Sequence, residues 1–510
     1  MTQTRLFGII DIGSNSVRLV LYEDAGHGIH RIVEESKKTI RLISKVARDG
    51  SLPLDQLDEL IATLLHFRSL CEAYRADFIR SVATAAIRNA TNSHEVVDAL
   101  HEATGLVIEI ASDEDEARYG FIGVMNAMDI SDGFLIDIGG GSSEITLFRD
   151  RKIIHSVSFP FGAVNTAKRF TPNGVTDETS LRDIRVMAET LFEQQPWLRQ
   201  HPGLPLIGLG GTIRTLAKLT QKRSGYSLPL THNYRIPLIT VHETIDLLGS
   251  MTLAQKLKVD GLNADRADIL VPGLVLLQTA LMHTGASTCI VSGTGLREGV
   301  YYETSCPDQP MTDHVLAHSI QILMHNAGIE STPHVEQVHR LALQLFDGLK
   351  AYHRLGSDAR NSLYAASKLF RIGAAINYYT YPAHTFYWIT HSRLNGLEHR
   401  EVVLAALIAA HTGKKKSRKA FLAHQDLLTE ADLSTAVALG TLLQLASALD
   451  SGRQSCVSRI EIVTSDGAPL LRLTCKSAPD AELDAAMKLS DDFRKTWGFP
   501  LRFAVKEQQA

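Results

Sequence analysis

Apolar residues dominate the start of the chain, and one short polar loop interrupts them. Residues 6–23 read LFGIIDIGSNSVRLVLYE, in which a continuous apolar run ends at Asp11 and Gly13 and an alternating run resumes after Ser16. This pattern predicts a buried strand, a tight glycine-containing turn and a half-buried strand that returns along the first. Residues 133–150, GFLIDIGGGSSEITLFRD, are built in the same way.

The two segments are related by one constant offset, which indicates an internal repeat. At this offset Asp11, Ile12, Gly13, Ser16 and Leu21 have identical counterparts in Asp137, Ile138, Gly139, Ser142 and Leu147. A short identical stretch alone is a weak signal, but the apolar run before each loop and the alternation after it match as well. We therefore predict two homologous lobes with a cleft between them.

The rest of the first 300 residues continues this alternation of strands and helices. Helical spacing is clear at 54–76, and further strands are expected at LPLIGLGG and TCIVSGTG. Strands that alternate with helices imply an α/β layer architecture. We place the first lobe at residues 1–125 and the second at residues 126–304.

The C-terminal part of the chain has a different pattern. A linker at 304–313 leads into residues 314–450, where helical periodicity dominates, and residues 451–510 predict a small α+β domain. In this last domain we expect a hairpin with its turn at Asp466 and Gly467, a single helix over ELDAAMKLSDDFRKTW and a closing strand.

Composition and charge narrow the class of protein. The net charge of −4 argues against a general nucleic-acid binder but leaves room for an anion in a locally basic groove. The five cysteines are widely spaced without any C-x-x-C, which disfavours disulfides and a zinc knuckle. Asp11 interrupts the N-terminal apolar run too early for a signal peptide, and the longest apolar segment, 269–282, is too short for a membrane span. We expect a cytoplasmic protein with neither a membrane nor a nucleic-acid partner.

Glycine-rich turns at strand ends are typical of anion sites, because backbone N–H groups converge where no Cβ blocks the approach. A third such loop, GLGGTIR at 208–214, follows a strand and opens a helix, so its N–H groups and the helix dipole also suit an anion. The predicted phosphate-binding residues are Gly13, Ser14, Asn15, Ser16, Gly139, Gly140, Gly141, Ser142, Gly210, Gly211 and Thr212. One such loop would fit an ordinary tight turn equally well, whereas three favour the phosphate hypothesis.

Carboxylates stand at the tips of the same hairpins. Asp11, Asp137 and Glu144 cannot bind phosphate directly, but they can hold Mg²⁺ that neutralises it. We therefore predict these three as metal ligands and Mg²⁺ as the cofactor.

Eight motifs in this order resemble the exopolyphosphatase and guanosine pentaphosphate phosphohydrolase family, within the actin-like phosphotransferase superfamily. The motifs are DIGSNSVRL (11–19), ATAAIRNATN (83–92), SDEDEAR (112–118), DIGGGSSE (137–144), FPFGAVN (159–165), GGTIRTLA (210–217), DRADILVPG (265–273) and SGTGLREG (292–299). They cover nearly all of residues 5–300. The resemblance implies two actin-like (ribonuclease H-like) lobes, followed by an HD-like helical domain.

The resemblance also implies roles for two catalytic residues. Glu116 matches the family's general base, which takes a proton from the attacking water, and a nearby carboxylate is what such a transfer needs. Arg88 matches an arginine that holds the terminal phosphates, and its planar guanidinium suits phosphate oxygens. Asp113 stands where the family usually has glycine, and we expect it to be one of several acids at an exposed helix N-terminus.

Two further arginines in family motifs are left outside the predicted site. Arg266 and Arg297 could bind substrate, or they could be buried partners of Asp268 and Glu298.

The helical domain departs from the HD pattern at its metal site. Phe370 and Arg371 stand where HD proteins have His and Asp, and neither can ligate a divalent metal. We therefore expect the nearby histidines, which are His384, His391, His399 and His411, to be core or surface residues. The aromatic residues between positions 378 and 388 suit a packed core or a dimer interface.

The segment GKKKSRK at 413–419 carries five cations within six residues. It fits a solvated loop with Gly413 ending the preceding helix, and it fits equally a docking surface for a long polyanion.

The resemblance implies an Mg²⁺-dependent exopolyphosphatase that releases terminal phosphate from inorganic polyphosphate by direct water attack, with a homodimer as the expected assembly. Hydrolysis of guanosine pentaphosphate would use identical chemistry, and the sequence does not reveal whether a base is recognised. An actin-like ATP-dependent kinase would need a nucleotide site and an acceptor pocket. A non-catalytic polyphosphate sensor is disfavoured because Glu116 is retained.

Overall fold

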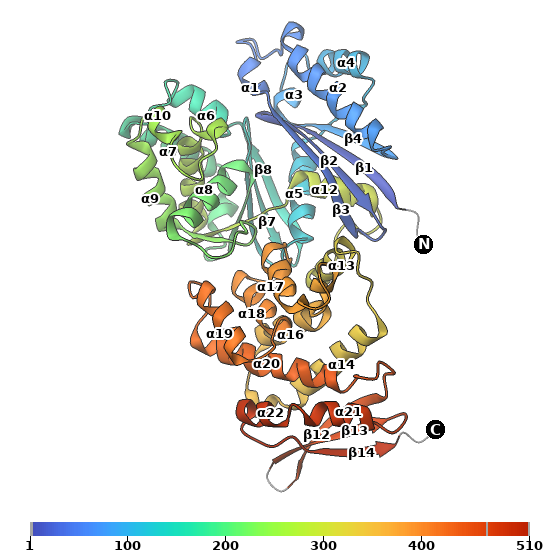
Figure 1. Ribbon diagram of the computed structural model, residues 1–510. Coiled ribbons are helices and arrows are strands. Elements are labelled where there is room, and N and C mark those ends of the chain that lie inside the picture. The colour runs from blue at the N-terminus through green and yellow to red at the C-terminus, as the bar shows by residue number, and fades with distance from the viewer. Residues whose placement is uncertain (1–3, 466–467, 508–510) are drawn as a thin grey trace. The chain divides into compact units, whose positions relative to one another are not determined.

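The computed structural model describes residues 4–465 and 468–507 of the chain (Figure 1). It divides into two compact units, the first formed by residues 1–226 and 231–315 and the second by residues 227–230 and 316–510. The first unit contains two lobes, each built on one sheet. The α/β prediction for this part of the chain is confirmed.

Lobe I is built on a five-stranded sheet in the order β3-β2-β1-β4-β5. β1 and β2 form the predicted hairpin, with Asp11 opposite Arg18, and β4 and β5 extend the sheet in parallel with β1. The elements of this lobe are β1 (Arg5–Ile12), β2 (Ser16–Asp24), β3 (His30–Thr39), α1 (Leu42–Lys45), η1 (Leu54–Gln56), α2 (Asp58–Ala73), β4 (Phe78–Ala83), α3 (Ala85–Arg88), α4 (Ser93–Thr104), β5 (Ile108–Ile110) and α5 (Asp113–Met125).

Lobe II repeats this arrangement and adds one edge strand, in the order β10-β11-β9-β6-β7-β8. β6 and β7 form the second predicted hairpin, with Asp137 opposite Glu144, so Glu144 and Arg18 occupy equivalent positions. The elements are β6 (Gly133–Ile138), β7 (Ser143–Arg149), β8 (Lys152–Phe159), α6 (Ala163–Phe170), α7 (Glu178–Phe192), η2 (Pro196–Arg199), β9 (Leu206–Leu209), α8 (Gly210–Ser224), β10 (Arg235–Pro237), α9 (Leu238–Gly249), α10 (Leu253–Lys256), η3 (Ala264–Arg266), α11 (Leu270–Thr284), β11 (Thr288–Val291) and α12 (Leu296–Ser305). The internal repeat predicted from the sequence is thus present in the sheets.

The last helix of lobe II packs back onto lobe I. α12 lies against α5 and β1, and its Tyr301 joins Phe7, Tyr22 and Tyr119 in one buried cluster. The two helices meet backbone to backbone, because a Cβ on Gly299 would lie 1.9 Å from the carbonyl oxygen of Tyr119. This close contact joins the lobes at the base of the cleft.

The most apolar segment of lobe II is its central helix. α11 is buried along nearly its whole length and lies in the core between β6 and the helices α7 and α9. The 269–282 segment, judged too short for a membrane span, is therefore a core helix whose burial stabilises the lobe.

The second unit is mainly helical, as expected from the periodicity. Its helices are α13 (Val315–Asn326), α14 (Pro333–Gly348), α15 (Lys350–His353), α16 (Ser357–Leu369), η4 (Ile372–Ala375), α17 (Tyr381–His391), α18 (His399–Ala409), α19 (Lys414–Phe421), η5 (Leu422–His424) and α20 (Glu430–Ala448). α20 is the one described helix that is long and apolar enough to cross a membrane, but 61% of its apolar window is buried. It packs against α14 and α18, which identifies it as a core helix.

The lysine-rich segment corrects one expectation from the sequence. Gly413 is the N-cap of α19, while the preceding helix α18 has its C-cap at Ala410. The interpretation of residues 413–419 as a loop after a helix is therefore wrong. The backbone of Gly413, with φ of 137°, turns the chain directly into a new helix.

The C-terminal region forms a three-stranded sheet in the order β12-β13-β14. β12 (Val457–Ser465) and β13 (Ala468–Cys475) form the predicted hairpin, whose expected turn residues Asp466 and Gly467 lie outside the described residues. β14 (Phe503–Glu507) is the closing strand and runs parallel to β13. The single helix expected here is wrong, because the chain forms α21 (Asp480–Met487) and α22 (Ser490–Trp497).

Candidate functional site

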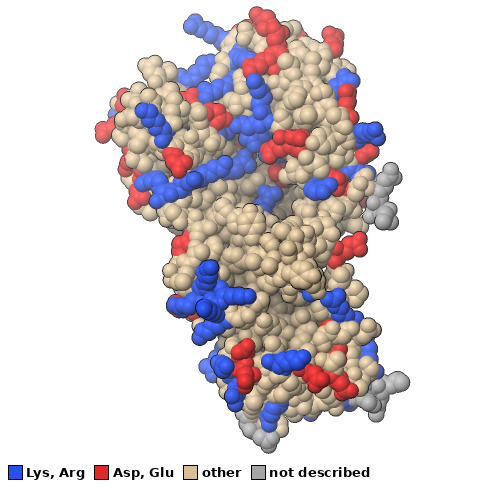
Figure 2. Space-filling view, viewed as in Figure 1, with Lys and Arg blue, Asp and Glu red and all other residues tan. Residues whose placement is uncertain are grey.

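A polar cavity of about 140 Å³ lies between the two hairpin loops of the first unit. Figure 2 shows basic side chains along the hollow between these lobes. Twelve of the residues predicted from the sequence line the cavity: Asp11, Gly13, Ser14, Asn15, Ser16, Glu116, Asp137, Gly139, Gly140, Ser142, Gly210 and Gly211. Four predicted residues lie outside this lining, and they are Arg88, Gly141, Glu144 and Thr212.

The two glycine loops have the same turn and touch each other. The N–H of Gly13 donates to the carbonyl of Ser16 at 3.2 Å, and the N–H of Gly139 donates to that of Ser142 at 3.0 Å. A Cβ on Gly140 would lie 3.1 Å from the backbone nitrogen of Asn15, so the loops of the two lobes are in contact. The Asn15 side chain is buried, and neither of its polar atoms has a hydrogen-bond partner among the described residues, as expected of a group that binds a ligand.

The third predicted loop opens helix α8. Gly210 has a φ of 87°, and a Cβ there would lie 2.7 Å from Oδ1 of Asp137. A Cβ on Gly211 would lie 2.0 Å from Nη2 of Arg266, so the guanidinium packs directly on the helix N-terminus. With glycine at both positions, the Arg266 guanidinium lies directly beside the N–H groups of the first helical turn.

Four arginines outside the predicted set also line the cavity: Arg18, Arg214, Arg266 and Arg297. The side chains of the first three have no hydrogen-bond or ion-pair partner among the described residues, whereas Arg297 pairs with Glu35 at 2.9 Å. Burial lowers the pKa of the Arg214 guanidinium to about 10, and it also lowers the pKa of Arg18 and Arg266. Buried guanidinium groups without partners are suited to bind an anion.

The sequence contained a signal for one of these arginines, Arg18. Arg18 follows Asp11 by the same spacing that separates Glu144 from Asp137, so the repeat itself places it across the hairpin from a cavity carboxylate.

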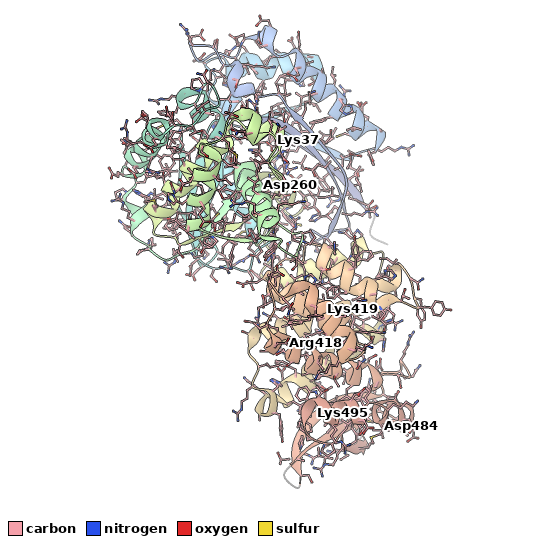
Figure 3. The ribbon with its side chains drawn as sticks, turned by 60° about the vertical axis from the view of Figure 1, so that its left-hand side comes forward. Lys37, Asp260, Arg418, Lys419, Asp484 and Lys495 are labelled. Carbon is pink, nitrogen blue, oxygen red and sulfur yellow. The ribbon has the colours of Figure 1, made fainter. Side chains whose placement is uncertain are left out.

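Ion pairs between the lobes show that Asp268 is not the partner of Arg266. Asp268 binds Arg41 of lobe I at 2.6 Å, and Asp265 binds Lys37 of β3 at 2.7 Å. Lys37 is labelled in Figure 3. Asp268 is thus paired with Arg41, and Arg266 is left to face the cavity.

Asp11 and Asp137 lie at equivalent points on the two hairpins, and both line the cavity. Neither carboxylate has a hydrogen-bond or ion-pair partner among the described residues. Burial raises the pKa of Asp137 to about 6, although Arg214 opposes this, and burial also raises the pKa of Asp11. A cation at this point would stabilise both ionised carboxylates.

Glu144 lies behind the main cavity rather than in its wall. It lines a second, smaller cavity of about 10 Å³ together with Glu116, Asp137 and Thr146, which is room for roughly one water molecule. Its Oε1 accepts a hydrogen bond from Ser158 at 2.9 Å. Burial and the neighbouring Glu116 raise the pKa of the Glu144 carboxyl.

Glu116 lies in the first turn of α5, with its side chain 15% exposed. The capping box of this helix joins Ser112 to Asp115 and directs the first turn towards the cavity. Burial raises the pKa of the Glu116 carboxyl to about 7, although the Arg88 guanidinium opposes this. A carboxylate with a pKa near neutrality is well suited to act as a general base.

Arg88 does not line the cavity, because acidic side chains surround its guanidinium. Nη1 donates to Glu116 at 2.7 Å and to the carbonyl of Ala111 at 3.1 Å, and Nη2 lies 2.5 Å from Asp113. The departure from the family pattern at position 113 therefore adds a second acid to this arginine. The position of Arg88 fits a residue that acts on Glu116 more directly than on a phosphate.

The donor set fits Mg²⁺ in the manner of phosphate-transfer enzymes. Among the described residues, no three His, Cys, Asp or Glu side chains are close enough to hold a metal alone. Mg²⁺ usually takes one or two carboxylates and completes its shell with water and substrate phosphates, and Asp11 and Asp137 supply such carboxylates.

The second unit keeps one acid–base pair near the altered HD position. Nδ1 of His334 lies 2.7 Å from the fully buried Asp450, and the ring of Phe370 packs edge-on against His334. Arg371 lies over the rings of Tyr378 and Tyr381. The two residues that replace the HD pair are thus engaged in packing.

The chain matches two family models. The model of the Ppx/GppA phosphatase family matches residues 19–306, and the model of domain III of Ppx/GppA phosphatases matches residues 316–486. The first match alone spans more than half of the chain and contains the whole cavity lining from residue 84 onward.

Named relatives and solved structures point the same way. The chain is 26% identical over 298 residues to proteins named exopolyphosphatase 1 from Mycobacterium tuberculosis and Mycobacterium bovis, covering 58% of this chain and 86% of theirs. A Ppx/GppA family member from Aquifex aeolicus is 27% identical with a TM-score of 0.52, covering 60% of this chain and 100% of that one. An exopolyphosphatase from Cytophaga hutchinsonii is 25% identical with a TM-score of 0.53 and the same coverage.

Proposed function

Because the chain belongs to the Ppx/GppA phosphatase family, we propose that it is an exopolyphosphatase that hydrolyses the terminal phosphate of inorganic polyphosphate. The observation that carries this proposal is a set of three arginines, Arg18, Arg214 and Arg266, which line one cavity with the glycine loops and have no ion-pair partner in the part of the chain that the structure describes. A chain of phosphates supplies anionic oxygens along its whole length, and it can satisfy guanidinium groups from both lobes at once.

The cavity lining favours a phosphate chain over a nucleotide. Its described residues are charged, polar, glycine or aliphatic, and they include no Phe, Tyr or Trp. A nucleobase is usually held by stacking on an aromatic ring or a guanidinium plane, in addition to hydrogen bonds. The lining offers no aromatic ring for such stacking, and its guanidinium groups are the ones assigned here to phosphates, so the composition supports polyphosphate as the substrate.

Glu116 is the proposed general base. Its carboxylate is in the cavity wall, where it can accept a proton from a water molecule that attacks the terminal phosphorus. The bond between this phosphorus and the bridging oxygen then breaks, and the shortened chain leaves with the bridging oxygen. Arg88 holds the Glu116 carboxylate in place by its 2.7 Å hydrogen bond.

The remaining residues act on charge and orientation. The glycine loops present N–H groups to the terminal phosphates, and the four arginines offset the charge that spreads over the equatorial oxygens in the transition state. Mg²⁺ bound through Asp11 and Asp137 would supply further neutralisation of the phosphate oxygens.

The test is phosphate release from long-chain polyphosphate and from guanosine pentaphosphate, compared by kcat/KM at the same Mg²⁺ concentration. We expect the larger kcat/KM with polyphosphate and release without any added nucleotide. A larger kcat/KM with guanosine pentaphosphate would assign that substrate instead, and a requirement for ATP and an acceptor would assign a kinase.

A further inference from the structure

Helix α6 begins directly against the second glycine loop and binds its carbonyl oxygens one after another. The N–H of Ala163 donates to Gly139 at 2.9 Å, and the N–H of Val164 donates to Gly140 at 2.9 Å. The third carbonyl, that of Gly141, is bound by the side-chain amide of Asn165 at 2.8 Å. All three glycine carbonyls are therefore held on the side of α6.

This arrangement decides which way the loop presents its N–H groups. A trans peptide is planar, so a carbonyl turned towards α6 turns the N–H of the following residue to the opposite side. The N–H groups concerned belong to Gly140, Gly141 and Ser142, and they have no acceptor among the described residues. Gly140 and Ser142 line the main cavity. An anion there is attracted by these N–H groups and would be repelled by the carbonyl oxygens.

The approach of α6 is too close for any other residue at its start. A Cβ on Gly162 would lie 2.6 Å from the carbonyl carbon of Gly140 and 2.7 Å from the carbonyl oxygen of Gly139. The backbone of α6 therefore packs against the backbone of the loop with nothing between them.

Asn165 contributes its side chain to this contact, and the amide oxygen and the amide nitrogen bind different backbone groups. Oδ1 accepts from the N–H of Gly162 at 2.6 Å, which caps the helix, while Nδ2 donates to Gly141 and also to Pro160 at 3.3 Å. An aspartate could replace the acceptor but not the donor.

In the first lobe, backbone N–H groups alone bind the carbonyls of the glycine loop. The carbonyl of Asn15 accepts from the N–H groups of Ile40 and Arg41 at 3.1 and 2.9 Å, and that of Ser14 accepts from Ile43 at 3.1 Å. The carbonyls of Gly140 and Gly141 are thus bound like those of the equivalent Ser14 and Asn15, with the side chain of Asn165 in place of a backbone donor.

We propose that Asn165 is a positioning residue, which holds the Gly141 carbonyl away from the cavity so that the loop offers N–H groups to the substrate phosphates. The inference rests on the proposed function, because it explains how the second glycine loop of the proposed site binds phosphate.

The test compares Asn165→Asp and Asn165→Ala with the unmodified protein. Inorganic phosphate binding is measured by calorimetry at low salt and at high salt, and Tm is measured for each protein. Asn165→Asp keeps the capping acceptor and adds an acid at a helix N-terminus, but it loses the donor to the Gly141 carbonyl, so its Tm should fall by less than that of Asn165→Ala, which loses the acceptor as well. It should nevertheless bind phosphate more weakly by roughly three- to tenfold, the size of one neutral hydrogen bond, at both salt concentrations. Asn165→Ala should show the same loss together with a lower Tm.

The matched control is Gln255→Glu. Gln255 caps helix α10 through the same kind of side-chain contact, accepting from the N–H of Thr252 at 2.8 Å, but it contacts no glycine loop of the site. This variant should leave phosphate affinity unchanged.

Unchanged phosphate affinity in both Asn165 variants would overturn the inference, because the amide would then only stabilise the helix. An affinity of Asn165→Asp that recovers at high salt would also overturn it, since a new charge near the anion would explain the loss. Failure of the unmodified protein to bind phosphate would contradict the proposed function itself.

Discussion

The guanidinium of Arg88 donates a hydrogen bond of 2.7 Å to the carboxylate of Glu116, so the residue expected to hold phosphate is paired with the expected base. On its other side the same guanidinium lies 2.5 Å from Asp113. Glu116 is thereby fixed at one oxygen and remains in the cavity wall. This relationship determines the first two predictions.

Glu116→Gln should lower kcat on polyphosphate by roughly 10²–10⁴, because it keeps the size of the side chain and removes its basicity. The hydrogen bond from Arg88 can still be accepted by the Gln oxygen, so the fold and the affinity for polyphosphate should be retained. Steady-state kinetics together with equilibrium binding measure the two effects. Near-normal turnover in this variant would contradict the assignment of the base.

The pH dependence follows from the burial that raises the pKa of Glu116 to about 7. The base acts only when ionised, so kcat/KM should fall as the pH is lowered through 7. Arg88 lowers this pKa, so Arg88→Gln should move the acidic limb of the profile to higher pH. A pH profile of kcat/KM for both proteins is the measurement, and a limb that stays in place would show that the 2.7 Å contact does not act on the base.

Mg²⁺ dependence should respond to a carboxylate of the cleft and not to histidines of the second unit. Asp137→Asn removes a hard anionic ligand, so it should raise the Mg²⁺ concentration needed for half-maximal activity and lower the maximal rate. His391→Gln and His411→Gln serve as controls, because His391 lies on Tyr387 and His411 bonds to Ser417 within the second unit. Loss of the Mg²⁺ response in a histidine variant, measured by titration of activity, would place the metal elsewhere.

The last prediction concerns the cationic helix α19, which appears as a cluster of basic side chains in Figure 2 and carries the labelled Arg418 and Lys419 in Figure 3. Arg418 pairs with Glu430 at 3.0 Å. The four lysines of the helix, Lys414, Lys415, Lys416 and Lys419, are exposed and have no ion pair among the described residues.

Replacing these four lysines with glutamine should leave short polyphosphates almost unaffected. Long chains should dissociate between cycles, so that intermediates accumulate on a gel, and the difference should shrink at high salt because exposed charges are screened. The control replaces four exposed lysines outside this helix, namely Lys476, Lys488, Lys495 and Lys506. Equal processivity of the two quadruple variants at low salt would show that α19 carries no special role.

The sequence alone determined the repeated hairpins, because their signal is local. An apolar run, an acid, a glycine turn and an alternating run specify strand, turn and strand without reference to the rest of the chain. The same offset that related Asp11 to Asp137 therefore predicted two equivalent sheets, and the three loops predicted to bind phosphate follow from this offset or from their glycines. Helix boundaries were less well determined, as Gly413 shows, because glycine can end one helix or begin another.

Only the tertiary structure decided which charged groups are paired and which are left to bind a ligand. Arg18, Arg214 and Arg266 come from three separate elements, and apart from the repeat spacing of Arg18 nothing in their local sequence distinguishes them from Arg41, Arg88 or Arg297, whose guanidinium groups are bound to acids. The partner of a buried charge depends on which distant segments pack beside it, and its pKa depends on the water that this packing excludes. For that reason the loops of this site could be predicted from the sequence, whereas its arginines and the setting of its base could not.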